Sequence, residues 1–376
     1  MRTANSETLR LMVTLNQAIA DANSGNAEAQ YALSQYYARQ NASEQARHWL
    51  ERAAAQGLPA ANYSLAQWLL ASARGLPDIA NAEQLLRRST EQHIAAAGSD
   101  IAKTTLMRDL PLSQLLPLAC DQLQMAAEQG HAAALRQLAM LRTEHQQQTL
   151  LGRAAALGDA LASHLLTVPY QTEKRPAATS QNRIVSISDF ASARECSYVM
   201  AYCRPLLRPS FIIDPKTGLR RPDPVRRSSG AVLDVQSTDV VCFALMRRVA
   251  EQLNLGWQRC EPVNVLRYLP GDEYRLHHDT FEHDPLQSSQ ETNGALPLNQ
   301  RSDTALLYLN DVESGGETEF PRLSERVTPK LGKLCHFENI KSGKPDPNMI
   351  HAGCAVNHGE KWLMTLWFRQ YPLLSD

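Results

Sequence analysis

The sequence of 376 residues has no apolar run close to the roughly 18 residues that a membrane-spanning helix requires. Residues 1–7 lack a basic segment leading into an apolar core, so no signal peptide is expected. Neither sign of charge is in excess, because 38 Lys and Arg nearly balance 39 Asp and Glu. The net charge of −1 offers no general attraction to nucleic acid or an anionic membrane. We therefore expect neither as a partner.

Cysteine is also sparse, and its seven residues follow no motif. They are odd in number, scattered, and without a Cys-x-x-Cys pair, so no zinc or thioredoxin-like site is indicated. Reduced, mostly buried thiols are the simplest interpretation and are typical of a cytoplasmic protein. The length allows two domains, and 43% hydrophobic and 20% charged residues are ordinary for a soluble globular protein.

Residues 1–168 are rich in Ala, Leu and Gln and repeat one short pattern. Ala-Ala-x-Gln-Gly occurs at 53–57 and 126–130, with related segments at 91–96 and 154–160. Because glycine commonly ends a helix, these segments mark turns between helices. The turn residues are spaced by 32, 36, 37 and 28 positions and are Gly25, Gly57, His93, Gly130 and Gly158. Such periods predict stacked helical hairpins.

This pattern resembles Sel1-like repeats, relatives of the tetratricopeptide repeat, over about residues 25–166. The resemblance implies an all-α solenoid at residues 1–168 whose surface docks a protein or peptide. The alternative is an array that only stabilises the C-terminal domain or a dimer. The sequence does not indicate the oligomeric state.

Residues 169–183 contain two prolines, several charges and a polar run, and we expect a connection there. A strand at 184–187 and a helix with Ser188 or Asp189 as its N-cap should follow. Another helix is expected at 240–253. Short β-type segments separated by turn residues occur at 210–213, 262–268, 304–309, 315–321, 333–337 and 362–368. They predict a sandwich or jelly roll.

Within this part, a turn and a strand are expected at residues 267–279, ending in His277-His278-Asp279. Alternate strand residues face the same side, so His277 and Asp279 can direct an imidazole and a carboxylate at one point. A histidine from a later strand would complete the 2-His-1-carboxylate triad of non-haem Fe(II) oxygenases. The candidates for that histidine are His336, His351 and His358.

Lys361 follows His351 by ten residues. If the two residues lay on a hairpin, they could face opposite ends of one small cavity. A dicarboxylate bound to the metal at one end would require a positive charge at the other. The residue types and their order therefore favour a metal site with a dicarboxylate cosubstrate.

Four ordered segments resemble the prolyl 4-hydroxylase branch of the Fe(II)/2-oxoglutarate dioxygenases. They are Tyr268-x-x-Gly271-x-x-Tyr274-x-x-His277-His278-Asp279, Leu307-Tyr308-Leu309-Asn310-Asp311-Val312-Glu313-x-Gly315-Gly316-Glu317-Thr318-x-Phe320-Pro321, His351-Ala352-Gly353-Cys354-x-Val356, and Gly359-Glu360-Lys361-Trp362. The resemblance implies a double-stranded β-helix (jelly roll) with flanking helices at residues 184–376.

The resemblance also implies site residues. His277, Asp279 and His351 would bind Fe(II). Lys361 would hold the distal carboxylate of 2-oxoglutarate, and the cosubstrate pocket would also contain Tyr268 and Thr318. The substrate side would include Arg226, Ser228, Tyr274, Arg301 and Trp367. Arg369 stands where related sequences often carry a histidine. We assign no function to His278, His283 or His336.

The implied reaction converts 2-oxoglutarate and O2 to succinate and CO2 and hydroxylates a substrate, with ascorbate (vitamin C) as reductant. The leading hypothesis is hydroxylation of a peptidyl proline in a protein docked by the repeats. The alternatives are another residue or a small molecule as substrate, or a non-catalytic interaction protein. Loops at 214–228 and 282–303 are expected to fold over the substrate.

Overall fold

The structure is a computed structural model that describes residues 15–73, 75–169, 176–181, 183–213, 220–222, 225–281 and 299–374. The chain divides into two compact units, which consist of residues 1–134 and 135–375. The division lies before the connection expected at 169–183, within the predicted repeats.

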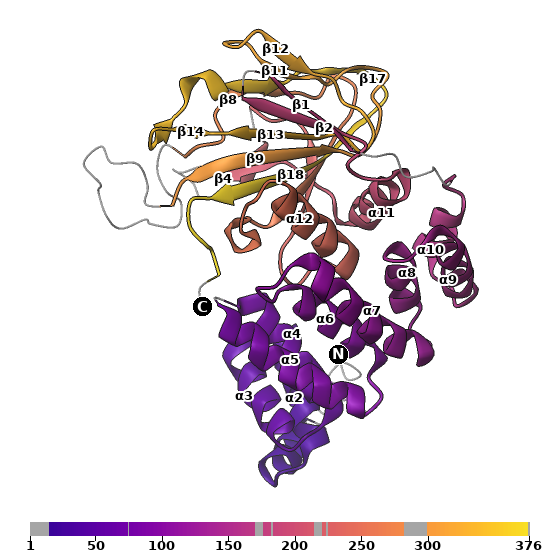
Figure 1. Ribbon diagram of the computed structural model, residues 1–376. Coiled ribbons are helices and arrows are strands. Elements are labelled where there is room, and N and C mark those ends of the chain that lie inside the picture. Colours follow the sequence, from indigo (N-terminus) through magenta and orange to yellow (C-terminus); the bar gives the residue numbers. More distant parts are fainter. Residues whose placement is uncertain are drawn as a thin grey trace, which may run out of the picture. The chain divides into compact units, whose positions relative to one another are not determined.

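The first unit is an array of helical hairpins, as the repeat spacing predicts (Figure 1). Its helices pair in sequence order, α2 with α3, α4 with α5, and α6 with α7. The bounds are α2 (Ala27–Arg39), α3 (Ser43–Ala55), α4 (Pro59–Ser72), α5 (Leu76–Glu91), α6 (Ala95–Leu106) and α7 (Leu112–Glu128). The predicted turn residues here all have positive φ angles, including 67° at His93, a non-glycine position. The left-handed turn is therefore required at each of these positions.

Successive hairpins are joined through their first helices. Tyr31 of α2 and Ser64 of α4 are linked by a 3.0 Å hydrogen bond between hydroxyls. One hairpin further on, the Tyr63 hydroxyl donates to Asp100 of α6 at 3.1 Å. Small residues such as Ala53 fill the contact between α3 and α4, which lets the helices approach closely. The ordered stacking is typical of a solenoid.

The second unit begins within α8 (Ala132–Met140), which is followed by α9 (Glu144–Ala156) and α10 (Ala160–Leu166). These helices pack against α11 (Ala193–Cys203). The His164 imidazole hydrogen-bonds the Ser197 hydroxyl at 3.0 Å, and the Arg194 guanidinium donates to the Gln147 side chain at 2.9 Å. The last repeat helices are therefore built into the unit that holds the sheets.

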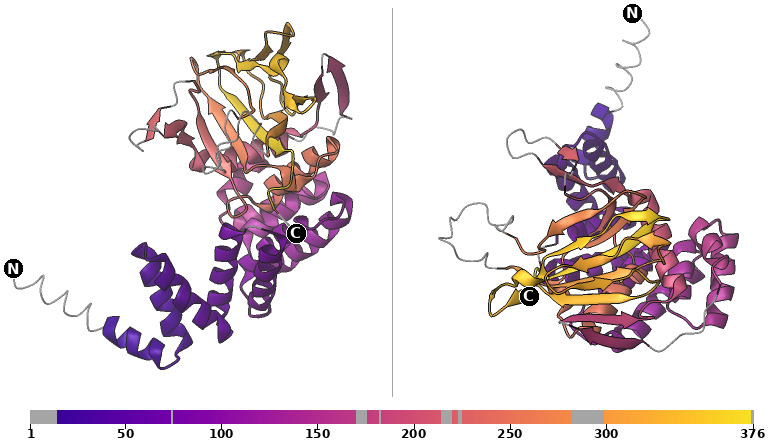
Figure 2. Two further views of the ribbon diagram at one scale, coloured as in Figure 1. Left: turned by 90° about the vertical axis from the view of Figure 1, so that its left-hand side faces the viewer. Right: turned by 90° about the horizontal axis from the view of Figure 1, so that it is seen from above.

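Two antiparallel sheets dominate this unit (Figure 2). The larger sheet has the order β1 (Ala177–Gln181), β2 (Ile184–Ser188), β13 (Leu334–Glu338), β9 (Arg301–Tyr308), β18 (Lys361–Arg369), β7 (Val263–Tyr268), β6 (Ser229–Leu233), β3 (Arg208–Pro209). The smaller has the order β12 (Glu325–Val327), β11 (Thr318–Phe320), β16 (His351–Gly353), β8 (Tyr274–His277).

Shorter elements complete the unit. Three two-stranded ladders are formed by β10 (Ser314–Gly315) with β17 (Val356–His358), β14 (Ile340–Lys341) with β15 (Lys344–Pro345), and β4 (Phe211–Ile213) with β5 (Arg220–Pro222). The remaining helices are α12 (Val240–Gln252) and the 3₁₀ turns η1 (Arg204–Leu206), η2 (Trp257–Arg259) and η3 (Pro347–Met349). The helix predicted at 240–253 is confirmed.

The core lies between the two sheets. Phe320 from the smaller sheet packs edge-to-face on Phe337 from the larger one, with ring centroids 5.0 Å apart. Tyr308 and Leu363 of the larger sheet belong to the same buried cluster. Every residue of β18 is buried, so both faces of this central strand are covered, and its residues 362–364 and 366–368 are apolar. The predicted jelly roll is confirmed.

Three local expectations differ from the structure. Residues 177–181 of the expected connection form β1, which pairs with β2. The N-cap of α11 is Ser192, not Ser188 or Asp189, because its hydroxyl and the Glu195 side chain form a reciprocal capping box. The strand expected to end in His-x-Asp stops at His277, and Asp279 lies just beyond it.

Candidate active site

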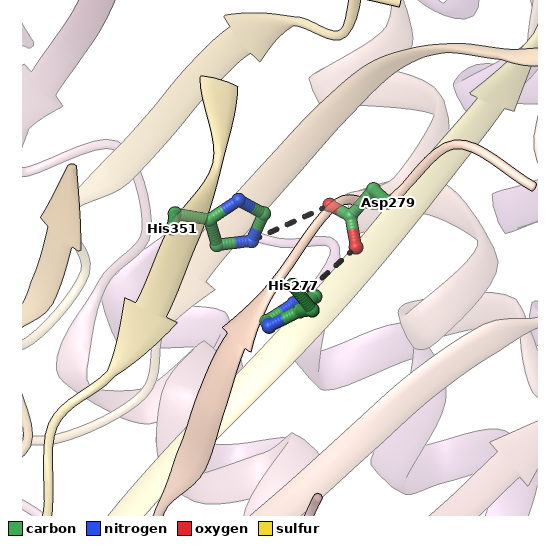
Figure 3. Close-up of side chains that lie close together, drawn as sticks. All are labelled: His277, Asp279 and His351. Carbon is green, nitrogen blue, oxygen red and sulfur yellow. Dashed lines mark ion pairs between the residues drawn. The ribbon is translucent and has the colours of Figure 1, made fainter. Parts of the chain in front are cut away.

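Two neighbouring strands bring the three predicted metal ligands together. His277 ends β8, and its pairing partner on β16 is His351. Asp279 follows β8 and lies between them, 3.7 Å from the Nε2 of His277 through Oδ1 and 3.7 Å from the Nε2 of His351 through Oδ2 (Figure 3). One ligand atom from each residue lies within 4.8 Å of the others. Among the described residues, this is the group with metal-ligand geometry.

Backbone carbonyls set the orientation of both imidazoles. The Nδ1 of His277 lies 2.7 Å from the carbonyl of Arg275, and the Nδ1 of His351 lies 2.9 Å from that of Met349. A carbonyl only accepts, so each Nδ1 carries the hydrogen and donates it. Each Nε2 therefore keeps its lone pair and is available as a ligand.

Burial and mutual charge also prepare the group for a cation. Burial, assisted by His351, lowers the pKa of His277 to about 4, so its imidazole is neutral near pH 7. Burial alone would raise the pKa of Asp279, but His351, His277 and Arg301 outweigh it and the net direction is downward. Two imidazoles that present Nε2 and a carboxylate form a donor set that fits Fe(II).

The other histidine candidates lie elsewhere. The His336 imidazole pairs with Asp303 at 3.1 Å, and His358 hydrogen-bonds the Ser314 hydroxyl at 3.1 Å. His278 is exposed. The structure thus selects His351 from the three candidates that strand alternation alone left open.

Lys361 lies in the same cavity as the triad. The cavity encloses about 380 Å³ of empty space, part of it open to solvent, and its lining includes His277, Asp279, His351 and Lys361. The ammonium lies 5.4 Å from the centroid of the Tyr268 ring and 5.6 Å from that of Tyr308. His351 lies on β16 and Lys361 on β18, and these strands belong to different sheets. The hairpin expected to join the two residues is therefore absent, although both line the cavity.

The Lys361 side chain is only 2% exposed, and no carboxylate in the described ranges lies within ion-pair distance of it. Burial lowers the pKa of its ammonium to about 8. A buried cation without an anionic partner is costly, and an anion that entered the cavity would remove that cost. The cavity therefore has a metal-ligand group and a cation suited to a dicarboxylate.

The predicted cosubstrate residues Tyr268 and Thr318 also line the cavity. The Thr318 hydroxyl is joined to the Tyr308 hydroxyl at 2.7 Å. A Cβ built at Gly353 would lie 3.8 Å from the Lys361 ammonium, so the small residue leaves the space beside it open. Leu266, Leu306 and Leu363 supply an apolar lining that limits water.

The sequence reasoning missed two threonines. Thr365 lines the cavity, and its buried hydroxyl has no hydrogen-bond partner in the described part of the chain. Thr304 hydrogen-bonds Asp279 from β9. Both lie outside the four recognised segments, and no local spacing indicates either of them.

The predicted substrate residues separate into two groups. Tyr274 and Trp367 line the cavity, and the Tyr274 ring stacks on His277 with centroids 3.5 Å apart. The Arg226 guanidinium lies over the Tyr274 ring, 5.5 Å from its centroid. Ser228 and Arg301 are not part of the lining. The Ser228 hydroxyl is hydrogen-bonded to that of Ser210 at 2.7 Å.

Arg301 has a carboxylate partner within the protein. Its guanidinium forms two hydrogen bonds to Glu261, of 2.8 and 2.7 Å, and lies 3.8 Å from the Trp367 ring centroid. Arg369 binds the same carboxylate and donates to the Asn299 carbonyl at 2.6 Å. Arg301 and Arg369 therefore share the one carboxylate of Glu261.

The loops expected to fold over a substrate lie mostly outside the described residues. The parts of these loops outside the description are residues 214–219, 223–224 and 282–298, and the last range contains His283.

Comparison with known proteins agrees with this geometry. The sequence model of the 2OG-Fe(II) oxygenase superfamily matches residues 263–369. Prolyl 4-hydroxylase 1 of Arabidopsis thaliana is 35% identical over 203 residues, which cover 50% of this chain and 69% of the plant protein. The chain belongs to the prolyl 4-hydroxylase family. Membership in this family implies Fe(II), 2-oxoglutarate and O2, and the His-Asp-His group fits that iron.

Two solved structures are similar to parts of this family member. A viral collagen prolyl hydroxylase from Paramecium bursaria Chlorella virus-1, in complex with 2OG, has 26% identity and a TM-score of 0.39. It covers 50% of this chain and 97% of its own. A Sel1 repeat protein from Oxalobacter formigenes has 24% identity and a TM-score of 0.33, covering 40% of this chain and 48% of its own.

Proposed function

We propose that the protein is an Fe(II)- and 2-oxoglutarate-dependent dioxygenase that hydroxylates a peptidyl proline in a protein substrate. One observation carries the proposal. The His277, Asp279 and His351 group shares a cavity with the buried Lys361, which has no carboxylate partner among the residues that the structure describes. Family membership supports the same reaction, since the relatives named above are prolyl hydroxylases.

The three ligands would hold iron from one side and leave the other open to cosubstrates. Iron with bound 2-oxoglutarate would supply the activation of O2 that hydroxylation of an unreactive C–H bond requires. Lys361 would orient 2-oxoglutarate by pairing with its distal carboxylate. The leucines of the lining would exclude water from the reacting centre.

The substrate would approach beside the aromatic residues of the lining. Tyr274 and Trp367 present flat, apolar faces next to the triad, and such faces suit the ring of a proline. Arg226, stacked over Tyr274, can donate to a peptide carbonyl. Arg301 would act by fixing Trp367 rather than by direct contact, because Glu261 occupies its guanidinium.

The N-terminal hairpins would dock the protein that carries the target proline, as the surfaces of repeat arrays commonly do. Ascorbate would restore the reduced iron when turnover fails to hydroxylate substrate. Succinate formation should therefore decline faster without ascorbate, and an identical time course would exclude that role.

We also propose a cytoplasmic setting, because all seven cysteines are free thiols. Fractionation of native cells tests this location. Recovery of the protein from a secreted fraction would contradict it.

Mass spectrometry tests the substrate class. The full-length protein would be incubated with Fe(II), 2-oxoglutarate and a library of proline-containing peptides, with the His277→Ala variant as control. A gain of one oxygen atom localised to proline, absent with the variant, is the expected result. Oxygen gain only on another residue or on an added small molecule would contradict proline hydroxylation while leaving the dioxygenase chemistry intact.

A further inference from the structure

A buried chain of hydrogen bonds leads from Asp279 into the larger sheet. The Thr304 hydroxyl lies 2.7 Å from Oδ2 of Asp279, and the side-chain nitrogen of Asn339 lies 2.9 Å from the Thr304 hydroxyl. Thr304 has no exposed surface and Asn339 is 3% exposed. Thr304 is in the middle of β9, and Asn339 directly follows β13. Strands β9 and β13 pair with each other.

Hydrogen counting fixes the direction of this chain. A carboxylate that binds a metal has no hydrogen to donate, so the hydroxyl of Thr304 must donate to Asp279. That hydroxyl has only one hydrogen, so it accepts from Asn339, whose amide nitrogen can only donate. Of the two carboxylate oxygens, Oδ2 is thereby occupied, and Oδ1 has no hydrogen bond within the described part of the chain.

The main chain of Asn339 extends the same support toward the third ligand. Its carbonyl accepts from the Asp346 backbone at 2.8 Å, and the Asp346 side chain caps η3 by accepting from the Asn348 backbone at 3.0 Å. Met349 ends η3, and its carbonyl accepts from the His351 imidazole. One short segment after β13 is therefore connected to both Asp279 and His351.

We propose that Thr304 and Asn339 are positioning residues that hold the Asp279 carboxylate in one rotation, with Oδ1 directed to the metal. The proposal rests on the metal centre of the proposed function. Without the Thr304 hydroxyl, the carboxylate could rotate and the buried Oδ2 would lack a donor. Loss of such support around a metal ligand typically weakens metal affinity.

Mn(II) titration of the metal-free full-length protein tests the proposal, because it does not require turnover. Thr304→Val should weaken Mn(II) binding about 10- to 100-fold, the usual effect of losing a hydrogen bond to a ligand. Asn339→Leu should weaken it less, since the Thr304 hydroxyl would remain. Thr304→Ser keeps the hydroxyl and should bind like wild type.

A matched control separates positioning from general damage to the fold. Thr238 is also a buried threonine of this unit, and its hydroxyl bonds a backbone carbonyl outside the cavity. Thr238→Val should leave Mn(II) affinity unchanged. The absorption spectrum of the Co(II)-substituted protein gives a second measure, which Thr304→Val should alter and Thr304→Ser should restore.

The outcomes are distinct. Equal Mn(II) affinity and equal Co(II) spectra for folded Thr304→Val and wild type would overturn the positioning role alone. If wild type bound no Mn(II) beyond a His277→Ala variant, the metal centre itself would be refuted, and both proposals with it.

Discussion

We propose that one buried charge, the ammonium of Lys361, determines the binding of 2-oxoglutarate. Its ammonium lies in the cavity without a carboxylate partner in the described ranges, next to the rings of Tyr268 and Tyr308. Removing it by Lys361→Ala should raise the KM for 2-oxoglutarate roughly 10- to 150-fold, since a charged hydrogen bond contributes about 1.5–3 kcal/mol. Succinate formation at varied 2-oxoglutarate measures this. An unchanged KM would show that the distal carboxylate binds elsewhere.

The same residue predicts a pH dependence. Burial lowers the pKa of Lys361 to about 8, so the ammonium is present below that pH and is lost above it. The groups that act on it are Glu317, Cys335 and Cys354. The KM for 2-oxoglutarate should therefore be constant near pH 7 and rise above about pH 8. In Lys361→Arg the cation persists, and a KM that rose equally in that variant would contradict this explanation.

Glu261 holds two arginines beside the cavity, and its charge should stabilise the fold. It pairs with Arg301 and with Arg369, which is only 3% exposed. Glu261→Gln leaves both cations without their anion and should lower the free energy of unfolding in urea by about 3 kcal/mol. Glu338 is an exposed partner of Arg183, so Glu338→Gln serves as the control. It should lower the free energy of unfolding by less than about 1 kcal/mol. Equal losses in the free energy of unfolding for the two variants would contradict the stabilising role of Glu261.

At the residue scale, spacing and motif order predicted that His277, Asp279 and His351 come together, but not which residues hydrogen-bond them. The His277-x-Asp279 spacing and the later His351 and Lys361 are visible in sequence. Thr304 and Asn339 act on Asp279 from positions 25 and more residues away, through strand pairing that no local pattern encodes. The pairing of Arg301 with Glu261 is equally non-local, and no local pattern in the sequence indicates it.

At the element scale, the Gly315-Gly316 turn holds β10 against β17. Gly315 has φ 78°, and a Cβ there would lie 2.2 Å from the Ala355 carbonyl oxygen. Gly315→Ala should destabilise the protein by more than the 1–2 kcal/mol or so that a left-handed residue costs by itself. Gly343→Ala is the control, since its φ is 75° but nothing lies within 4 Å of the added Cβ. Thermal unfolding should therefore place Gly315→Ala below Gly343→Ala, and the reverse order would contradict the contact argument.

The elements themselves were largely predictable. The repeated glycines and His93 indicated the turns between helices. Runs of β-branched and aromatic residues indicated the strands of the core. β1 was missed because its sequence, Ala177–Gln181, is fully exposed and has no apolar alternation. Its strand state comes from pairing with β2. The cap of α11 could have been found, since Ser192-x-x-Glu195 is a capping-box pattern.

At the scale of the whole molecule, the last repeat helices belong to the unit that contains the sheets. The Arg136 guanidinium lies 5.5 Å from the Tyr198 ring centroid and donates to Asp159 at 2.9 Å. A chain that begins at residue 131 keeps these contacts, whereas one that begins at 169 loses them together with the His164–Ser197 bond. We expect the shorter chain to melt at least about 5 °C below the longer one.

The longer truncation also tests the docking role of the first unit. A chain that begins at residue 131 should turn over short proline peptides with unchanged KM. The KM for an intact protein substrate should rise, because the hairpins of residues 1–130 would be missing. Equal kinetics on the intact substrate would leave the array with a structural role only.

The central claim is that His277, Asp279, His351 and Lys361 form an Fe(II)/2-oxoglutarate active site. Succinate release measures it most directly, in anaerobically iron-loaded full-length protein exposed to O2 and 2-oxoglutarate with the proline peptides. His277→Ala should abolish iron-dependent succinate, whereas His278→Ala, which changes the exposed neighbour, should retain it. If the folded, iron-loaded wild type released no more succinate than His277→Ala, the account would be contradicted.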